Sequence, residues 1–265
     1  MRLLILPAAL HTWSMSRFVC LALALLTLNS ARGEIISIAA AANFALALDA
    51  LNLEFKKFSP TTSVAVSTGA SGSIVAQIKT GAPYDVFLSA DLEYPKALIK
   101  AGEADEKSLV TFATGRLVLW TTKPGVELKS VSEVLRDPAV KKIAIANVDT
   151  APYGRAAKAV LEKLGVWDDV KTKLVTGESI TQTAQFVESG NADAGFVSLS
   201  VVLAPRLKGQ GRYLEVPAVL YPPLAHGAIL TNRGAKKNGA KDYVDFLRSP
   251  LARRVLEEFG YAVPK

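Results

Sequence analysis

Apolar segments of strand length alternate with amphipathic segments of helix length along the chain from about residue 34 onward. Apolar runs at 35–41, 63–67 and 85–88 predict strands, and helical spacing of apolar positions predicts helices at 43–58, 73–81 and 94–101. The first helix is expected to end at Ser59-Pro60. This order of strand, helix, strand, helix, strand, helix is typical of a parallel sheet with helices on its faces.

A second unit of the same kind follows. Strands are predicted at 116–121, 142–146, 173–175, 192–197, 214–216 and 227–230, and helices at 131–136, 155–164, 180–188, 240–248 and 250–260. No segment repeats another in sequence, so only the architecture is repeated. In such sheets ligands bind at the carboxyl ends of the strands, in the crevice between the units.

The first 33 residues have the pattern of a secretory signal. Basic Arg17 precedes an apolar run at 18–26, and the small residues Ala31 and Gly33 follow it. Cleavage after Gly33 fits best, cleavage after Ala31 is the alternative, and a shorter leader that starts at Met15 fits the same pattern. The run is too short to anchor the chain across a bilayer. We therefore expect a signal peptide at 1–33 and a periplasmic protein.

Loss of this leader narrows the range of functions. The net charge falls from +7 to about +4, because Arg2, Arg17 and Arg32 leave without any acid, and the remaining charge is not clustered as in nucleic-acid-binding proteins. The one cysteine, Cys20, leaves too, so the exported chain forms no disulfide and no thiolate metal site. Any catalysis by Ser-His-Asp would depend on the single remaining histidine, His226.

Four turns that lead from an apolar strand into a helix share a feature that suits anion binding. None of them contains Lys, Arg or His; they are Ala42-Asn43, Ala70-Ser71-Gly72, Pro152-Tyr153-Gly154 and Ser179-Ile180. A helix start carries free backbone N–H groups and about half a positive charge, so each turn offers neutral donors. If the turns face one another, they form a seat for a tetrahedral anion.

Each turn also has an ordinary explanation. Asn43 and Ser179 are common helix N-caps, and Pro152 suits the first turn of a helix. The small residues around Ser71 suit a simple change of chain direction, and Tyr153 taken singly is compatible with a surface aromatic. Taken one at a time, the turns leave both interpretations open.

Longer motifs around these turns resemble the periplasmic molybdate-binding proteins of ABC transporters. The motifs are AAANF at 40–44, TGASGSIVAQI at 68–78, GAPYDVFLSAD at 81–91, IAN at 145–147 and APYG at 151–154. The resemblance extends from about residue 34 to 264, and GAPYDVFLSAD is its most specific part. It implies an α/β protein with the two-lobed type II fold of periplasmic solute-binding proteins. Each lobe would hold a mixed, mostly parallel sheet flanked by helices, with the ligand in the interlobe cleft.

The same resemblance implies that the chain crosses between the lobes twice. Lobe 1 is expected to comprise residues 34–113 and 219–265, and lobe 2 residues 114–218. Hinges near 114–115 and 218–224 would let the lobes close on the ligand.

Carried onto this chain, the resemblance assigns the oxyanion ligands to the four turns. Asn43 would donate through its side-chain amide and backbone, Ala42 through its N–H, and Ser71 through its hydroxyl and N–H. Tyr153 and Ile180 would each donate a backbone N–H from lobe 2. Molybdenum would enter only as the oxyanion, through these same residues, and no cofactor is expected.

This chain departs from the family pattern at two positions. Many members have Ser or Thr where this chain has Ala42, so one hydroxyl donor is absent and Asn43 would compensate for it. Some members have a ligand-contacting Tyr near the position of Ser198. The set of hydrogen-bond donors in this chain is therefore expected to differ from that of many family members.

The expected function is capture of molybdate and tungstate by a monomer, and delivery to an inner-membrane ABC permease with a cytoplasmic ATPase. Neither catalysis nor nucleic-acid binding is expected. Sulfate would be excluded by the size of the cavity, and phosphate because its proton needs an acceptor. The exclusion of phosphate assumes that Asp149 and Glu178, which lie near two of the loops, face solvent.

Other functions fit parts of the same pattern. A binder of sulfate or phosphate would use the same turns, whereas a ferric-ion binder would need more ligands than Tyr153 and Tyr221. A secreted serine hydrolase would need His226 to reach Ser71 and a carboxylate to orient the imidazole.

Overall fold

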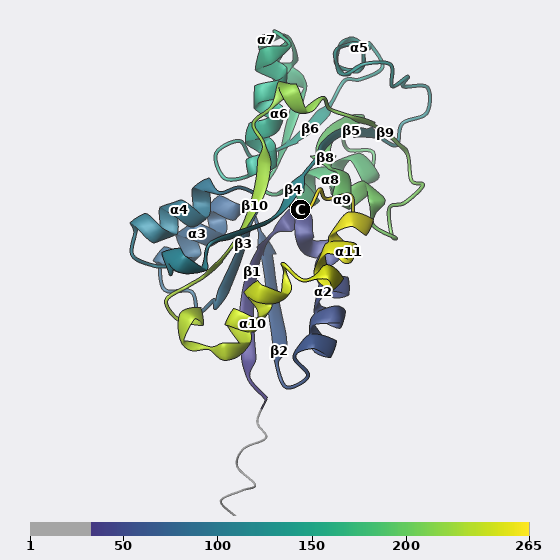
Figure 1. Cartoon of the computed structure of the whole chain (residues 1–265). Coiled ribbons are helices and arrows are strands. Elements are labelled where there is room, and N and C mark those ends of the chain that lie inside the picture. Colours follow the sequence, from purple (N-terminus) through teal and green to yellow (C-terminus); the bar gives the residue numbers. More distant parts are fainter. Residues whose placement is uncertain (1–32, 265) are drawn as a thin grey trace, which may run out of the picture. The chain divides into compact units, whose positions relative to one another are not determined.

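The computed structural model describes residues 33–264, which contain two five-stranded sheets with helices around them (Figure 1). The expected leader lies outside the described residues, apart from Gly33. Within the described region, no helix has the length and apolarity needed to cross a membrane.

The first sheet has the strand order β2-β1-β3-β10-β4. Its strands are β1 (Ile35–Ala41), β2 (Ser63–Gly69), β3 (Val86–Ser89), β4 (Val110–Gly115) and β10 (Leu224–Leu230). Strands β2, β1 and β3 pair in parallel, and β10 pairs antiparallel with both β3 and β4. All the strands except β10 therefore point the same way, which agrees with a mixed, mostly parallel sheet.

Helices cover both faces of this sheet, and its central strand β3 is accordingly buried on both sides. The helices are α2 (Ala45–Phe58), α3 (Ser71–Lys79), α4 (Glu93–Lys100), α10 (Asn238–Phe246) and α11 (Pro250–Glu258). On β1, Ala39 clusters with Ile74 of α3, whereas Ile38 belongs to the larger core cluster with Phe55 of α2. Successive strand residues point to opposite faces, so α3 and α2 cover opposite sides. Helix α11 lies beside α2 (Figure 1).

The second sheet follows the same plan, with the strand order β7-β6-β8-β5-β9. Its strands are β5 (Leu117–Thr121), β6 (Ile143–Ala146), β7 (Leu174–Gly177), β8 (Ala194–Ser198) and β9 (Arg212–Glu215). The helices along this part of the chain are α5 (Val131–Arg136), α6 (Pro152–Lys163), α7 (Trp167–Val170), α8 (Ile180–Glu188) and α9 (Leu199–Leu203). Here β5 alone runs against the others. The prediction of one architecture used twice is confirmed.

The chain passes between the two sheets twice. It leaves the first sheet after Gly115 at the end of β4, and it returns between Glu215 of β9 and Leu224 of β10. These crossings lie near the expected lobe boundaries at 113/114 and 218/219. That the parts on either side of them move as separate lobes stays a prediction. The C-terminal segment returns to the first crossing, because the backbone of Ala262 exchanges hydrogen bonds of 2.7 and 3.0 Å with Thr114.

Two of the helices that begin earlier than the sequence predicts start at the turns of interest. Helix α3 begins at Ser71 rather than 73, and α6 at Pro152 rather than 155. The glycines that suggested turn residues lie in the first helical turns. A Cβ on Gly154 would lie 2.4 Å from the Ala146 carbonyl oxygen, and one on Gly72 would lie 2.5 Å from the Tyr94 hydroxyl. Close approach, rather than chain reversal, requires glycine at both positions.

The sequence interpretation also missed β4 and the short helices α7 and α9. No strand is predicted from the sequence between residues 101 and 116, yet β4 pairs along β10 with an irregularity between His226 and Gly227. The partner strand lies more than a hundred residues away, as in the pair of Thr114 with Ala225, so local pattern gives little sign of it. Long-range pairing, and not local propensity, places this strand.

The buried carboxylate of Asp85 yields a test of the fold. It is fully buried, accepts a hydrogen bond of 2.7 Å from the Ser37 N–H, and pairs with Lys237 at 2.8 Å and Arg233 at 3.2 Å. We expect Asp85→Asn to lower the free energy of unfolding by about 2–4 kcal/mol, because two cations lose their buried partner. Urea denaturation of the leaderless protein measures this change.

The matched control is Glu93→Gln, which removes a carboxylate from the exposed pair with Lys96 at 3.5 Å. This change is expected to alter stability by less than about 0.5 kcal/mol. Equal, small effects of the two substitutions would contradict the assigned role of Asp85.

Candidate functional site

The five residues assigned to the oxyanion site line one cavity between the two sheets. Ala42, Asn43 and Ser71 come from the first sheet's side, and Tyr153 and Ile180 from the second. The rest of the lining is made of small or apolar residues, namely Ala41, Gly69, Ala70, Ala90, Ala151 and Pro152. The cavity is narrow, with about 10 Å³ of free space, so no extended molecule fits into it.

Several helices begin at the wall of this cavity. Helix α3 begins at Ser71, α6 at Pro152 and α8 at Ile180, and the short 3-10 turn Ala42–Phe44 leads into α2. The first N–H groups of a helix have no acceptor within it, and they carry the positive end of its dipole. The lining contains no Lys, Arg, Asp or Glu. The cavity therefore offers fixed, neutral hydrogen-bond donors, which suit a small anion.

The Ser71 hydroxyl is oriented to donate. Ser71 is fully buried, and its Oγ accepts a hydrogen bond of 3.2 Å from the Ala90 N–H. Because that contact uses the oxygen as an acceptor, the hydroxyl proton stays available to the cavity. The next residue, Gly72, donates its N–H to the Thr150 carbonyl at 2.9 Å and so ties the start of α3 to the loop before α6.

Asn43 does not act as an N-cap. Its Nδ2 lies 3.0 Å from His226 Nε2 and donates to the Tyr261 hydroxyl at 2.9 Å. Its main-chain oxygen accepts from the hydroxyls of Tyr261 and Ser200, each at 3.0 Å. Both aromatic partners escaped the sequence interpretation because they lie 183 and 218 residues away along the chain. No local signal in the sequence links them to Asn43.

Tyr153 is not a surface aromatic. Its side chain is buried, its hydroxyl has no hydrogen-bond partner, and burial raises the pKa of the phenol well above its ordinary value. The residue follows Pro152 at the start of α6, so its N–H is one of the free donors of that helix. Its ring stays uncharged at physiological pH.

At the fourth turn, an ordinary helix N-cap stands directly before a residue of the cavity wall. Ser179 Oγ accepts from the Gln182 N–H at 3.3 Å, so Ser179 is a helix N-cap. Ile180, the first residue of α8, lines the cavity. The next residue, Thr181, donates its hydroxyl to the Ala42 carbonyl at 2.9 Å and connects the start of α8 with the first loop.

His226 has the surroundings of a structural residue. It is fully buried, and desolvation lowers its pKa from 6.5 to about 3, against weaker opposing effects of the Ala113 and Leu224 carbonyls. Its Nε2 contacts Asn43 rather than Ser71, and its Nδ1 has no hydrogen-bond partner. The arrangement that a serine hydrolase needs, with His226 between Ser71 and a carboxylate, is not formed.

The remaining candidates lie outside the cavity lining. Asp149 and Glu178 are exposed, as the exclusion of phosphate requires. Ser198 is buried and shares a hydrogen bond of 3.0 Å with Ser200. Across residues 33–264, no group of three or more His, Cys, Asp or Glu side chains is placed to hold a metal ion.

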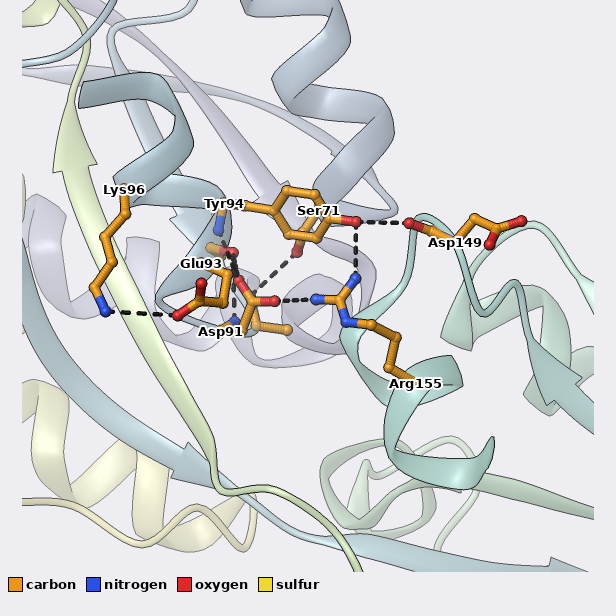
Figure 2. A network of polar contacts seen from close by, with 9 residues as sticks. Ser71, Asp91, Glu93, Tyr94, Lys96, Asp149 and Arg155 are labelled. Carbon is orange, nitrogen blue, oxygen red and sulfur yellow. Dashed lines mark hydrogen bonds and ion pairs between the residues drawn. The ribbon is translucent and has the colours of Figure 1, made fainter. Parts of the chain in front are cut away.

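A polar network beside the cavity joins the two halves of the site; we call Asp91, Tyr94, Asp149 and Arg155 the interlobe network. Figure 2 shows the Tyr94 hydroxyl between its two partners: it accepts from Arg155 Nη1 and donates to the Asp149 carbonyl, each at 2.9 Å. Arg155 Nη2 also pairs with the Asp91 carboxylate, and its guanidinium lies 4.9 Å from the centre of the Tyr94 ring. These contacts hold α6 against the segment at the start of α4.

Comparison with known proteins places the chain among binding proteins. The sequence pattern of the family described as bacterial extracellular solute-binding protein matches residues 36–262. The molybdate-binding protein ModA of Azotobacter vinelandii is 39% identical over 95% of this chain and 99% of its own length. ModA of Rhodobacter capsulatus is 40% identical over 89% of this chain and 91% of its own length.

A solved structure agrees with these sequence relationships. The periplasmic molybdate-binding protein of Azotobacter vinelandii superposes with a TM-score of 0.82 at 35% sequence identity, over 87% of this chain and all of that protein. The two-lobed type II fold expected from the sequence is confirmed.

The buried, neutral His226 yields a prediction for stability against pH. Its pKa is about 3 in the folded chain and 6.5 when unfolded, so the unfolded chain binds the extra proton between these values. The free energy of unfolding should therefore fall as the pH drops below 6.5, by up to about 1.4 kcal/mol per pH unit. Above that pH, His226 should contribute no slope.

Urea denaturation of the leaderless protein between about pH 7.5 and 5 measures this slope, since carboxylates mostly titrate below that window. His226→Gln, which does not titrate there, should flatten the profile. Equal slopes for the two proteins would contradict the prediction.

Proposed function

Because the chain belongs to the family of bacterial extracellular solute-binding proteins, we propose that it captures molybdate, and tungstate in the same site, and delivers the anion to an ABC importer. The observation that carries the proposal is that one and the same cavity is lined by Ala42, Asn43, Ser71, Tyr153 and Ile180. The names of the Azotobacter and Rhodobacter relatives, both molybdate-binding proteins, support the choice of anion.

The binding chemistry follows from the donors around the cavity. Molybdate is a tetrahedral dianion that only accepts hydrogen bonds, and backbone N–H groups at helix starts together with the Ser71 hydroxyl only donate them. Each hydrogen bond to a charged group contributes about 1.5–3 kcal/mol, so a handful of donors supports tight binding without a counter-ion. No cofactor takes part.

Selection among oxyanions would combine size and protonation. Sulfate has the charge and shape of molybdate but is smaller, so donors that close on the larger anion would contact sulfate less well. Hydrogen phosphate carries a proton that needs an acceptor, and the lining has no carboxylate to accept it. Both effects favour molybdate and tungstate.

The proposal includes a route from export to delivery. The leader at 1–33 would direct the chain to the periplasm as a monomer, and the lobes would close on the anion by movement at the two crossings between sheets. The closed form would then dock on an inner-membrane permease that works with a cytoplasmic ATPase.

Calorimetric titration of the leaderless protein tests the proposed ligand. We expect molybdate and tungstate to bind more tightly than sulfate or phosphate, because the proposed selection by size and protonation favours the larger dianions. Tighter binding of sulfate or phosphate would show that the protein binds an oxyanion other than molybdate. Absence of binding by all four anions would overturn the proposed function.

Ser71→Ala tests the donor that comes from a side chain. Loss of one hydrogen bond to a charged ligand should weaken molybdate binding by about 1–3 kcal/mol. Ser73→Ala serves as the control, because Ser73 lies two residues further along α3, is exposed and does not line the cavity. Isothermal titration of both variants measures the difference in affinity for molybdate. Equal affinities would show that the Ser71 hydroxyl does not bind the anion.

Arg155→Gln tests the contribution of the interlobe network to closure. The substitution removes the pair with Asp91 and the hydrogen bond to Tyr94, so the closed form that binds the anion is less populated. Molybdate affinity should fall roughly fivefold, or by about 1 kcal/mol.

The control for this variant is Arg206→Gln, which removes an ion pair with Glu188 within the second lobe. Calorimetry should show an unchanged affinity for it. A similar loss in both variants would show that general surface charge, and not the interlobe network, affects binding.

A further inference from the structure

Three buried polar atoms beside the cavity have no hydrogen-bond partner. They are Asn43 Oδ1, Tyr153 OH and His226 Nδ1. Asn43 contacts His226 directly, and Tyr153 and His226 meet at Gly115, where a Cβ would lie 2.1 Å from the phenol oxygen and 2.4 Å from His226 Cε1. Because buried polar atoms almost always have partners, three such atoms in one cluster point to a second arrangement of the cluster.

The orientation of the Asn43 amide determines which of its two polar atoms lacks a partner. Its Nδ2 is used by His226 and Tyr261, which leaves Oδ1 as the polar atom of the side chain without a partner. Asn43 lines the cavity, and the two branches of an amide diverge, so Oδ1 is the end directed away from those partners. An acceptor oxygen in that position would repel an oxyanion, whereas Nδ2 would bind it.

We propose that His226 is a positioning residue that determines which end of the Asn43 amide meets the anion, through a change of tautomer coupled to a turn of the amide. This inference rests on the proposed function, because the anion drives the change. In the structure described here, Nε2 accepts from Nδ2 and the ring proton is on Nδ1. In the loaded form, Nε2 carries the proton and donates to the turned Oδ1, so that Nδ2 faces the anion.

The change leaves the ring neutral, since the N–H bond at Nδ1 breaks and one at Nε2 forms, with no net gain or loss of a proton. The lowered pKa of His226 agrees with a ring that exchanges tautomers rather than becoming charged. An amide has nearly the same shape after it is turned, so the packing around Asn43 is retained.

The turned arrangement gives Asn43 Oδ1 two donors and makes His226 Nδ1 an acceptor. Oδ1 accepts from His226 Nε2 and from the Tyr261 hydroxyl, while Ser200 keeps its hydrogen bond to the Asn43 main-chain oxygen. The Tyr153 hydroxyl lies near His226 Cε1 at Gly115, so a shift of this hydroxyl toward Nδ1 would supply the donor that Nδ1 then needs. The anion then takes the Nδ2 donor.

Without the anion, a proton on Nδ1 leaves Nε2 free to accept from Asn43 Nδ2. The change of tautomer breaks this hydrogen bond, so the anion must supply the difference through its contact with Nδ2. The cluster therefore has two arrangements, and the anion selects one of them.

Nitrogen NMR of the leaderless protein tests this directly, because His226 is then the only histidine. Without ligand, Nδ1 should have the shift of a protonated ring nitrogen and Nε2 that of an unprotonated one. Saturation with molybdate should exchange the two assignments at constant pH. A purely structural histidine would keep its tautomer.

Two variants separate the role of the His226 ring nitrogens from that of the size of the ring. His226→Phe removes both nitrogens and should weaken molybdate binding by about tenfold or more, whereas His226→Gln, whose amide N–H can still donate to Oδ1, should remain within about threefold of the parent. Urea denaturation confirms that each variant is folded before its affinity is compared. Equal affinities of the Phe and Gln variants would overturn the inference.

The outcomes also separate this inference from the proposed function. Molybdate binding with unchanged nitrogen shifts would overturn the role of His226 and leave the proposed function standing. No heat of binding in calorimetry would overturn both.

Discussion

The proposed site has to hold a small doubly charged group with donors that carry no formal charge. Neutral donors provide enough stabilisation only when several reach the same point, and so the starts of α3, α6 and α8 must approach one another closely. This constraint explains the small residues of the lining. It also explains Gly154, where any side chain would collide with the Ala146 carbonyl and force the start of α6 out of place.

The first ligand loop is held by parts of the chain that are distant in sequence. Tyr261 lies near the C-terminus, and His226 lies on β10, the strand by which the chain returns to the first sheet. Ser200, in the second lobe, contacts the same Asn43 carbonyl as Tyr261. Hydrogen bonds thereby link Asn43, a proposed ligand, to segments beside both crossings between the sheets, where movement of the lobes is expected. The buried cluster thus connects the ligand site with the hinge regions.

Local pattern predicted most of the fold, and the resemblance to a family located the candidate site. Helices 131–136 and 180–188 were placed correctly, because their caps and apolar spacing are local properties. The five candidate ligands came together in one cavity, although their role as ligands stays a prediction. The partners of Asn43 could not be predicted, since tertiary packing alone brings Tyr261 and His226 to it. The early starts of α3 and α6 were missed because glycine indicates a turn in sequence, whereas here it allows close contact.

The central claim is that the oxyanion lies between the helix starts of the two lobes and is held by neutral donors. A crystal structure of the leaderless protein with molybdate, with data collected at a molybdenum absorption edge, locates the metal atom without reference to the protein phases. The account predicts one strong anomalous peak in the cavity lined by Ser71, Tyr153 and Ile180, with oxygens in hydrogen-bond contact with their donors. A peak outside this cavity, or one held by Lys or Arg side chains, would contradict it.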